Sequence, residues 1–126
     1  KSEKSSKFFF RALDQFFKIE NINKKIDAII FSSHTRESEM PIFSAKIQEK
    51  YKINNNILCY DLPGSCSGFT NGLLHANAFL HSGTAKKILL ICADAHSKVA
   101  EKNLLPVIGD ALSCIIIKKI QKKKLF

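Results

Sequence analysis

Short apolar runs alternate with helix-like segments along this chain, and this alternation constrains the fold more than any other feature. The runs at residues 26–33, 57–62, 87–93 and 112–120 are rich in isoleucine and leucine, as strands are. Strands that alternate with helices form parallel crossover units, which bring functional groups to the carboxyl ends of the strands. We therefore expect an α/β fold with a mostly parallel sheet and covering helices.

Three helices are expected before and between these strands. The first covers residues 6–19, and the second begins near Pro41 and ends before the asparagine run at 54–56. The third covers residues 66–81, with Gly83 as its carboxyl-terminal cap. This third helix is expected to bury one stripe of side chains: Phe69, Leu73, Ala76 and Leu80.

Length and composition favour one domain. A chain of 126 residues that is 45% hydrophobic suits a single α/β core over residues 1–126, or part of a larger one. The sequence has no stretch typical of a membrane span or of a signal peptide, so we expect a cytoplasmic protein without a membrane partner. Because the first residue is Lys1, we also expect the chain to be a fragment of a longer protein.

The net charge and the spacing of the cysteines indicate which binding partners and metal sites to expect. The net charge of +9 comes from lysines concentrated near both ends, which form either a solvated face or a surface for an acidic partner. Nucleic acid is not the expected partner, because the aromatic segment at 7–20 has the spacing of a helix that buries its phenylalanines. The four cysteines form no CxxC pair and no zinc-like spacing with histidine, so no metal site is expected.

Cys66 differs from the other cysteines in its surroundings, because it follows a strand and a turn-forming PGS sequence at the start of a helix. A helix N-terminus stabilises a thiolate and offers free backbone N–H groups to an oxyanion. On this chemistry alone Cys66 is either a nucleophile or a packed side chain. The remaining cysteines lie in apolar runs, where a cysteine behaves as a small buried hydrophobe: Cys59, Cys92 and Cys114.

A nucleophilic cysteine usually works with a histidine, and the sequence contains four. His75 and His81 belong to the helix that follows Cys66 and lie about 13 Å or more along its axis, at a rise of about 1.5 Å per residue. They are too far away to act on the thiol. His34 and His96 follow strands and approach the rim of the sheet, but a loop histidine more often has no catalytic duty, and neither is assigned a role.

The segment YDLPGSCSGFTNGLL, residues 60–74, resembles the nucleophile segment of β-ketoacyl-acyl-carrier-protein synthase III, a family of the thiolase-like superfamily. The flanking segments, from the strand at 26–33 to GDALSCIII at 109–117, match that family in order and distance. The resemblance implies one incomplete half of the two-fold thiolase-like repeat, with a mixed, mostly parallel sheet. The family pattern in the nucleophile segment is matched by Asp61, Cys66, Gly68 and Phe69.

The resemblance also implies an activity. Cys66 would accept an acyl group from acyl-coenzyme A, without a covalently bound cofactor, for condensation with malonyl-carrier protein in fatty-acid or related biosynthesis. Met40 would reach into the acyl pocket of a partner subunit in a homodimer. The catalytic histidine and asparagine would come from a second half, so the fragment alone is expected to be inactive. The turns around the site would be shaped by Gly64, Gly68, Gly109 and Asp110.

Two other functions stay open. A non-catalytic thiolase-like half would serve as a dimerisation or carrier-protein docking module, and its basic surface would suit an acidic carrier protein. A redox-sensing thiol protein would depend on Cys66 alone. By the same resemblance, residues 86–94 are expected at the edge of the sheet, paired across a dimer axis, and apolar surface is expected where the second half packs.

Overall fold

A computed structural model describes residues 4–19, 25–99, 103 and 107–120; the expected basic termini lie partly outside this range. Four strands form one mixed sheet in the order β2-β1-β3-β4, in which only β4 runs antiparallel to its neighbour. The described elements, in chain order, are α1 (Ser5–Ile19), β1 (Ala28–Ser33), α2 (Phe43–Lys50), β2 (Leu58–Pro63), α3 (Gly68–Ser82), β3 (Lys87–Ala95), a 3-10 turn (His96–Lys98) and β4 (Asp110–Lys118).

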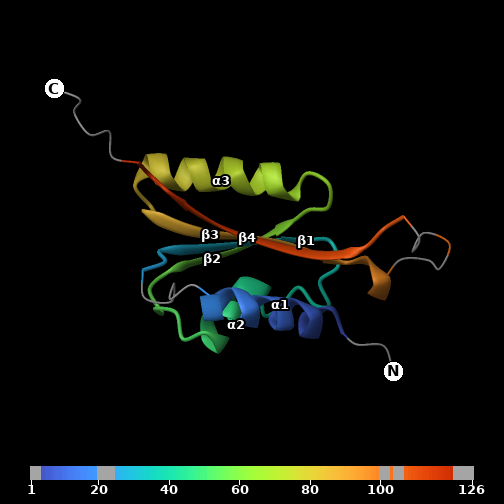
Figure 1. Ribbon diagram of the computed structural model, residues 1–126. Coiled ribbons are helices and arrows are strands. Elements are labelled where there is room, and N and C mark those ends of the chain that lie inside the picture. Colours follow the sequence, from blue (N-terminus) through green and yellow to red (C-terminus); the bar gives the residue numbers. More distant parts are fainter. Residues whose placement is uncertain (1–3, 20–24, 100–102, 104–106, 121–126) are drawn as a thin grey trace.

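The helices cover both faces of the sheet, as the alternating pattern predicted. Figure 1 shows α1 and α2 on one face and α3 on the other. Every residue of β1 is buried, which agrees with its continuous apolar sequence. The strand lies between β2 and β3, and all three run parallel, so their carboxyl ends meet at one edge of the sheet.

An aromatic cluster joins α1 and α2 to their face of the sheet. Phe9 of α1 is buried and packs edge-on against Phe31 of β1 and Phe43 of α2, with ring centroids 5.7 and 5.5 Å apart. Leu13, one turn further along α1, is fully buried as well. The expectation that the phenylalanine-rich first helix is amphipathic and buries one side is confirmed.

The buried stripe of α3 differs from the expected one. Ala76 and Leu80 are buried, but Phe69 and Leu73 are 45% and 36% exposed. Two glycines occupy the buried side in their place, Gly68 and Gly72. Both stripes fit a helical period, and glycine carries no hydropathy signal, so periodicity alone selected the wrong side for the first half of this helix. Glycine lets the helix backbone approach the sheet closely: a Cβ at Gly72 would lie 2.5 Å from a methyl carbon of Leu90.

The expectation that residues 86–94 form an edge strand is wrong. These residues are mostly in β3, which pairs with β1 over Ile88–Cys92 on one side and with β4 over Lys87–Ala95 on the other. Over Ile88–Cys92 both sides of the strand are therefore paired, and there β3 has no free edge for a partner chain. In the described sheet the outer strands are β2 and β4.

Asp61 of β2 anchors the beginning of α2. Its two carboxylate oxygens accept hydrogen bonds from the backbone N–H groups of Phe43 at 2.7 Å and Ser44 at 2.9 Å. The Asp61 side chain is 3% exposed, with the Arg36 guanidinium 3.9 Å away. The helix begins at Phe43 rather than at Pro41, and this carboxylate from a neighbouring element takes the place of a local capping side chain.

Replacing Asp61 by Ala is expected to lower the free energy of unfolding by about 3 kcal/mol, because two buried backbone donors lose a charged acceptor. Asp61→Asn keeps one acceptor oxygen and should lose about half as much. Urea unfolding followed by circular dichroism measures both changes. Glu49→Ala, which removes an exposed carboxylate from the same helix, is the control, and equal effects of Asp61→Ala and Glu49→Ala would contradict the anchoring role.

Candidate functional site

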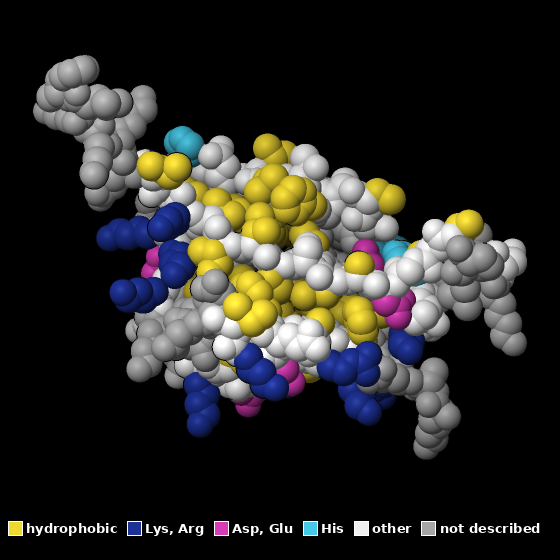
Figure 2. All heavy atoms as spheres, viewed as in Figure 1, with side chains coloured by type: hydrophobic (Ala, Val, Ile, Leu, Met, Phe, Trp, Pro, Cys, Tyr) yellow, Lys and Arg dark blue, Asp and Glu magenta, His cyan; other side chains and the backbone are white. Residues whose placement is uncertain are grey.

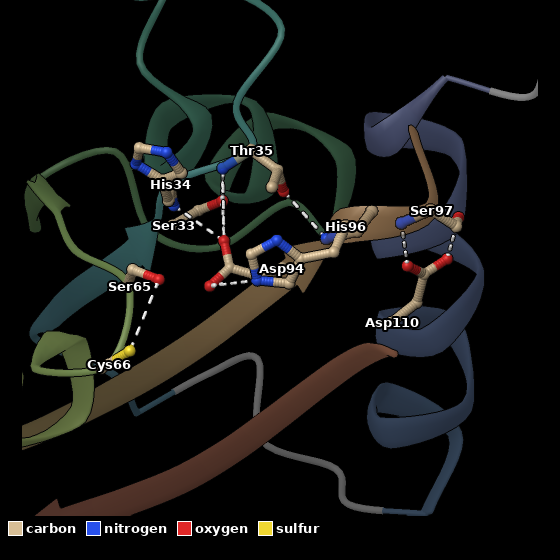
Figure 3. Close-up of polar contacts among 10 residues, drawn as sticks. Ser33, His34, Thr35, Ser65, Cys66, Asp94, His96, Ser97 and Asp110 are labelled. Carbon is tan, nitrogen blue, oxygen red and sulfur yellow. Dashed lines mark hydrogen bonds and ion pairs between the residues drawn. The ribbon is translucent and has the colours of Figure 1, made fainter. Parts of the chain in front are cut away.

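Cys66 lies in the turn between β2 and α3, two residues before the helix begins. The sequence placed the helix start at Cys66, but Ser67 is the N-cap residue and Gly68 the first helical residue. The N–H of Gly68 donates to the carbonyl of Ser65 at 3.0 Å and closes the turn. The Cys66 side chain is exposed, and its Sγ lies 4.0 Å from the hydroxyl oxygen of Ser65 (Figure 3). An electrophile can therefore reach this thiol from solvent.

Two glycines press this turn against the carboxyl end of β1. A Cβ at Gly64 would lie 2.6 Å from the Ser32 hydroxyl oxygen and 2.7 Å from the Cα of Gly68. A Cβ at Gly68 would also collide with the Ser32 hydroxyl. This close packing places Cys66 over the end of β1. A side chain at position 64 or 68 would clash with Ser32, so glycine at both positions allows the close approach. No comparable contact exists at Gly109, where an added Cβ would meet no described atom within 4 Å.

A cavity of about 370 Å³ opens beside Cys66. Its wall is built from the turn at 65–68, the ends of β1 and β3, and the beginning of β4. The cavity therefore lies at the carboxyl ends of parallel strands, where the sequence predicted functional groups. Its volume falls within the usual range for small-molecule sites.

One of the four histidines lines this cavity in the described part of the chain. His96 stands there with its Nε2 3.9 Å from Oδ2 of Asp94. His34 is exposed, and its ring points away from Asp94 in Figure 3. His75 and His81 lie along α3, and each ring Nδ1 contacts a carbonyl oxygen one turn earlier in the helix, at 2.8 and 3.0 Å. Neither of these two is among the cavity residues, as the helix geometry predicted.

Asp94, which the sequence pattern did not single out, ties the end of β3 to the loop after β1. Its Oδ1 accepts hydrogen bonds from the N–H of His34 at 2.8 Å, the N–H of Thr35 at 3.2 Å and the hydroxyl of Ser33 at 3.3 Å (Figure 3). The Thr35 hydroxyl accepts the N–H of Ala95 at 2.8 Å. The sequence did contain a signal for these contacts, because polar residues directly follow the apolar runs at 26–33 and 87–93. The carboxyl ends of such strands meet at one edge of a parallel sheet, so the polar residues that follow them are expected to lie close together.

Asp110 is the first residue of β4 and holds the turn that follows β3. The backbone N–H of Ser97 donates to it at 2.8 Å, and the Ser97 hydroxyl donates to its other oxygen. Burial raises the pKa of Asp110, but these hydrogen bonds and the positive charge of Lys98 outweigh burial and leave the pKa below its usual value. The carboxylate thus stays ionised and holds the turn at the rim of the cavity.

The other three cysteines divide between the two faces of the sheet. Cys92 lines the cavity together with Cys66, whereas Cys59 and Cys114 pack against the core under α1 and α2. Burial raises the pKa of all three thiols, that of Cys114 to about 12. These thiols are therefore protonated near neutral pH, and all four cysteines are free. That Cys92 faces the same cavity as Cys66 was not indicated by its apolar sequence context.

Met40 lies in the loop between β1 and α2, where it is 78% exposed and joined to Pro41 by a cis peptide bond. It is not among the residues that line the cavity of its own chain. Its expected contact with the acyl pocket of a partner subunit stays a prediction.

No group of histidine, cysteine, aspartate and glutamate side chains in the described part of the chain is arranged to hold a metal ion. None of the helices within the described ranges combines the length and apolarity that crossing a membrane requires.

The sequence matches the family model of 3-oxoacyl-[acyl-carrier-protein (ACP)] synthase III over residues 60–126, more than half of the chain. A β-ketoacyl-[acyl-carrier-protein] synthase III of Neisseria gonorrhoeae is 31% identical over 105 residues, covering 81% of this chain and 32% of the relative. A second such synthase, from Bacillus anthracis, is 29% identical over 104 residues, covering 80% and 32%. The chain thus spans about a third of the length of these curated relatives.

Solved structures of such synthases share the fold. The synthase III of Aquifex aeolicus superposes with a TM-score of 0.70 at 26% identity, over 78% of this chain and 32% of that one. That of Pseudomonas aeruginosa superposes with a TM-score of 0.80 at 18% identity, over 98% and 39%. The thiolase-like fold expected from the sequence is confirmed. The chain belongs to the 3-oxoacyl-[acyl-carrier-protein] synthase III family.

Proposed function

We propose that the complete protein is an acyltransferase of the 3-oxoacyl-[acyl-carrier-protein] synthase III type, with Cys66 as its nucleophile. The observation that carries this proposal is the exposed Cys66 thiol on a tightly packed turn beside a cavity, in a chain of this family. The other cysteine in the cavity, Cys92, has a raised pKa and is a poorer source of thiolate. Cys66 is therefore the better candidate of the two.

In the proposed reaction the thiolate of Cys66 attacks the carbonyl carbon of an acyl-coenzyme A. The bond from that carbon to the coenzyme A sulfur breaks, and coenzyme A leaves and takes up a proton. The thioester on Cys66 then passes its acyl group to malonyl-carrier protein as carbon dioxide is lost. The backbone N–H of Cys66 contributes, in this proposal, to the site that stabilises the oxyanion of the first step.

Residues 1–126 form, in this proposal, one amino-terminal domain of a longer cytoplasmic enzyme. Its catalytic histidine and asparagine lie in the second half, so the isolated domain does not complete the reaction. In this proposal the protein has no covalently bound cofactor and uses acyl-coenzyme A and an acyl carrier protein as its partners. Met40 extends from one subunit of a homodimer into the acyl pocket of the other, which its exposure in the single chain allows.

Apolar surface on the described chain supports such an assembly. Three large apolar side chains of α3, the helix that follows Cys66, are 36% to 63% exposed: Phe69, Leu73 and Leu74. Figure 2 shows further apolar side chains gathered over the middle of the face that carries β4. A group of exposed large apolar side chains is typical of a surface that another domain or subunit covers. We infer that the second half and a second subunit cover it.

A non-catalytic docking module is the second candidate, because the same apolar surface would also serve a protein that only assembles with others. In that case Cys66 would be dispensable, and carrier-protein binding would be electrostatic and would weaken with salt. The acylation experiment below separates the two candidates.

The full-length protein, incubated with acetyl-coenzyme A, is expected to gain one acetyl group, as seen by intact-mass spectrometry. Cys66→Ser should gain none, because a hydroxyl at this position is a much weaker nucleophile than a thiolate. Cys59→Ser, which removes a partly buried thiol on the other face of the sheet, is the matched control and should be acetylated like the wild type. If the wild type gains no acetyl group, or if Cys66→Ser gains an equal amount, Cys66 is not the nucleophile.

Sedimentation velocity is expected to show the full-length protein as a dimer at micromolar concentration. Met40→Asp is expected to keep the fold, since Met40 is exposed in the single chain, but to weaken the dimer or slow acylation by placing a charge in the partner's apolar pocket. Circular dichroism checks the fold of the variant. A wild-type protein that sediments as a stable monomer would contradict the proposed assembly.

A further inference from the structure

The wall of the Cys66 cavity contains a polar pair that the proposed reaction does not use. Asp94 and His96 lie at the end of β3 and line the cavity together with apolar residues such as Ala93 and Leu112. An aliphatic acyl chain would need no polar side chains in this wall. The pair therefore bears on which acyl group the cavity accepts.

The carboxylate of Asp94 is held rigidly by its own chain. Its Oδ1 accepts the three hydrogen bonds from residues 33–35 described above, so this oxygen is occupied by protein donors. The other oxygen, Oδ2, faces Nε2 of His96 at 3.9 Å. Because three donors of residues 33–35 hold Asp94 in place, its carboxylate lies at a fixed position beside the His96 ring.

The second ring nitrogen of His96 has no hydrogen-bond partner among the described residues. In the tautomer that carries its proton on Nε2, the nitrogen that faces Asp94, the imidazole presents Nδ1 as a hydrogen-bond acceptor. A hydroxyl group satisfies such an acceptor by donating its proton, whereas a ketone or an alkyl chain does not. Asp110, the other nearby carboxylate, is engaged by Ser97 and does not compete for the same proton.

We propose that His96 is a specificity-determining residue, and that the acyl group accepted by Cys66 is short and carries a hydroxyl that donates to His96. The inference rests on the proposed acyltransferase function and names its substrate class. The cavity volume of about 370 Å³ suits a short acyl group together with the end of its carrier. An acyl group without the hydroxyl would leave the imidazole nitrogen desolvated and unpaired, which disfavours that substrate.

The test compares acyl donors of equal carbon number on the full-length protein. Butyryl-, acetoacetyl-, 3-hydroxybutyryl- and 4-hydroxybutyryl-coenzyme A are incubated with the protein, and the initial rate of Cys66 acylation is followed by intact mass. Of the two hydroxyacyl donors, the one that reacts more quickly is expected to exceed the rates of butyryl- and acetoacetyl-coenzyme A about tenfold. One additional hydrogen bond in a partly buried site accounts for a difference of this size.

Variants at positions 96 and 34 identify the residue responsible for the preference. His96→Leu should abolish the preference by slowing the hydroxyacyl donor and not the butyryl donor, while His96→Asn, which keeps a hydrogen-bond acceptor, should retain part of it. His34→Leu alters an exposed histidine outside the cavity and should leave the preference unchanged. If His96→Leu fails to fold, an unchanged preference in His96→Asn and His96→Ala decides against the proposal.

The outcomes separate the two levels of inference. Equal rates for butyryl and hydroxyacyl donors in the wild type, or the same preference in wild type and His96→Leu, overturn the role of His96 and leave the acyltransferase intact. Absence of acylation by every donor overturns the proposed function, and the role of His96 falls with it.

Discussion

The close contact between the turn at 64–68 and Ser32 of β1 is the constraint on which the site depends. Neither Gly64 nor Gly68 can carry a side chain without displacing the Ser32 hydroxyl, which is buried and without a hydrogen-bond partner among the described residues. A further glycine, Gly72, continues the close approach of α3 along β3. The thiol of Cys66 is thereby held at the rim of the sheet and not carried outward on a longer loop.

Carboxylates that bind backbone N–H groups hold the loops around this contact. Asp61 binds the start of α2, Asp94 the loop after β1, and Asp110 the turn after β3. At the opposite end of the sheet, Asp27 accepts the N–H groups of Lys86 and Lys87, both at 2.9 Å. Hydrogen bonds to a charged acceptor are stronger than neutral ones. In a chain with a net charge of +9, these few acidic side chains act largely as structural anchors.

Local patterns predicted the order and type of the elements because continuous apolar runs and helical spacing are visible in sequence. They failed where the answer depended on what an element packs against. The buried side of α3 is occupied by Gly68 and Gly72, which have no apolar side chain to reveal it, and Phe69 and Leu73 were taken for core. The edge position expected for residues 86–94 came from the family resemblance and not from a local pattern, and pairing with β1 and β4 places β3 inside the sheet instead.

The sequence by itself determined the α/β class, the strand and helix order, the Gly83 cap and the unusual setting of Cys66, because each depends on neighbouring residues. Only the tertiary structure decided that Asp94, His96 and Cys92 share a cavity with Cys66. It also decided that Asp61, part of the family pattern, anchors α2. The residues at the end of β3 are at least 26 positions from Cys66 in sequence, and parallel pairing of β1, β2 and β3 is what brings these strand ends to one edge.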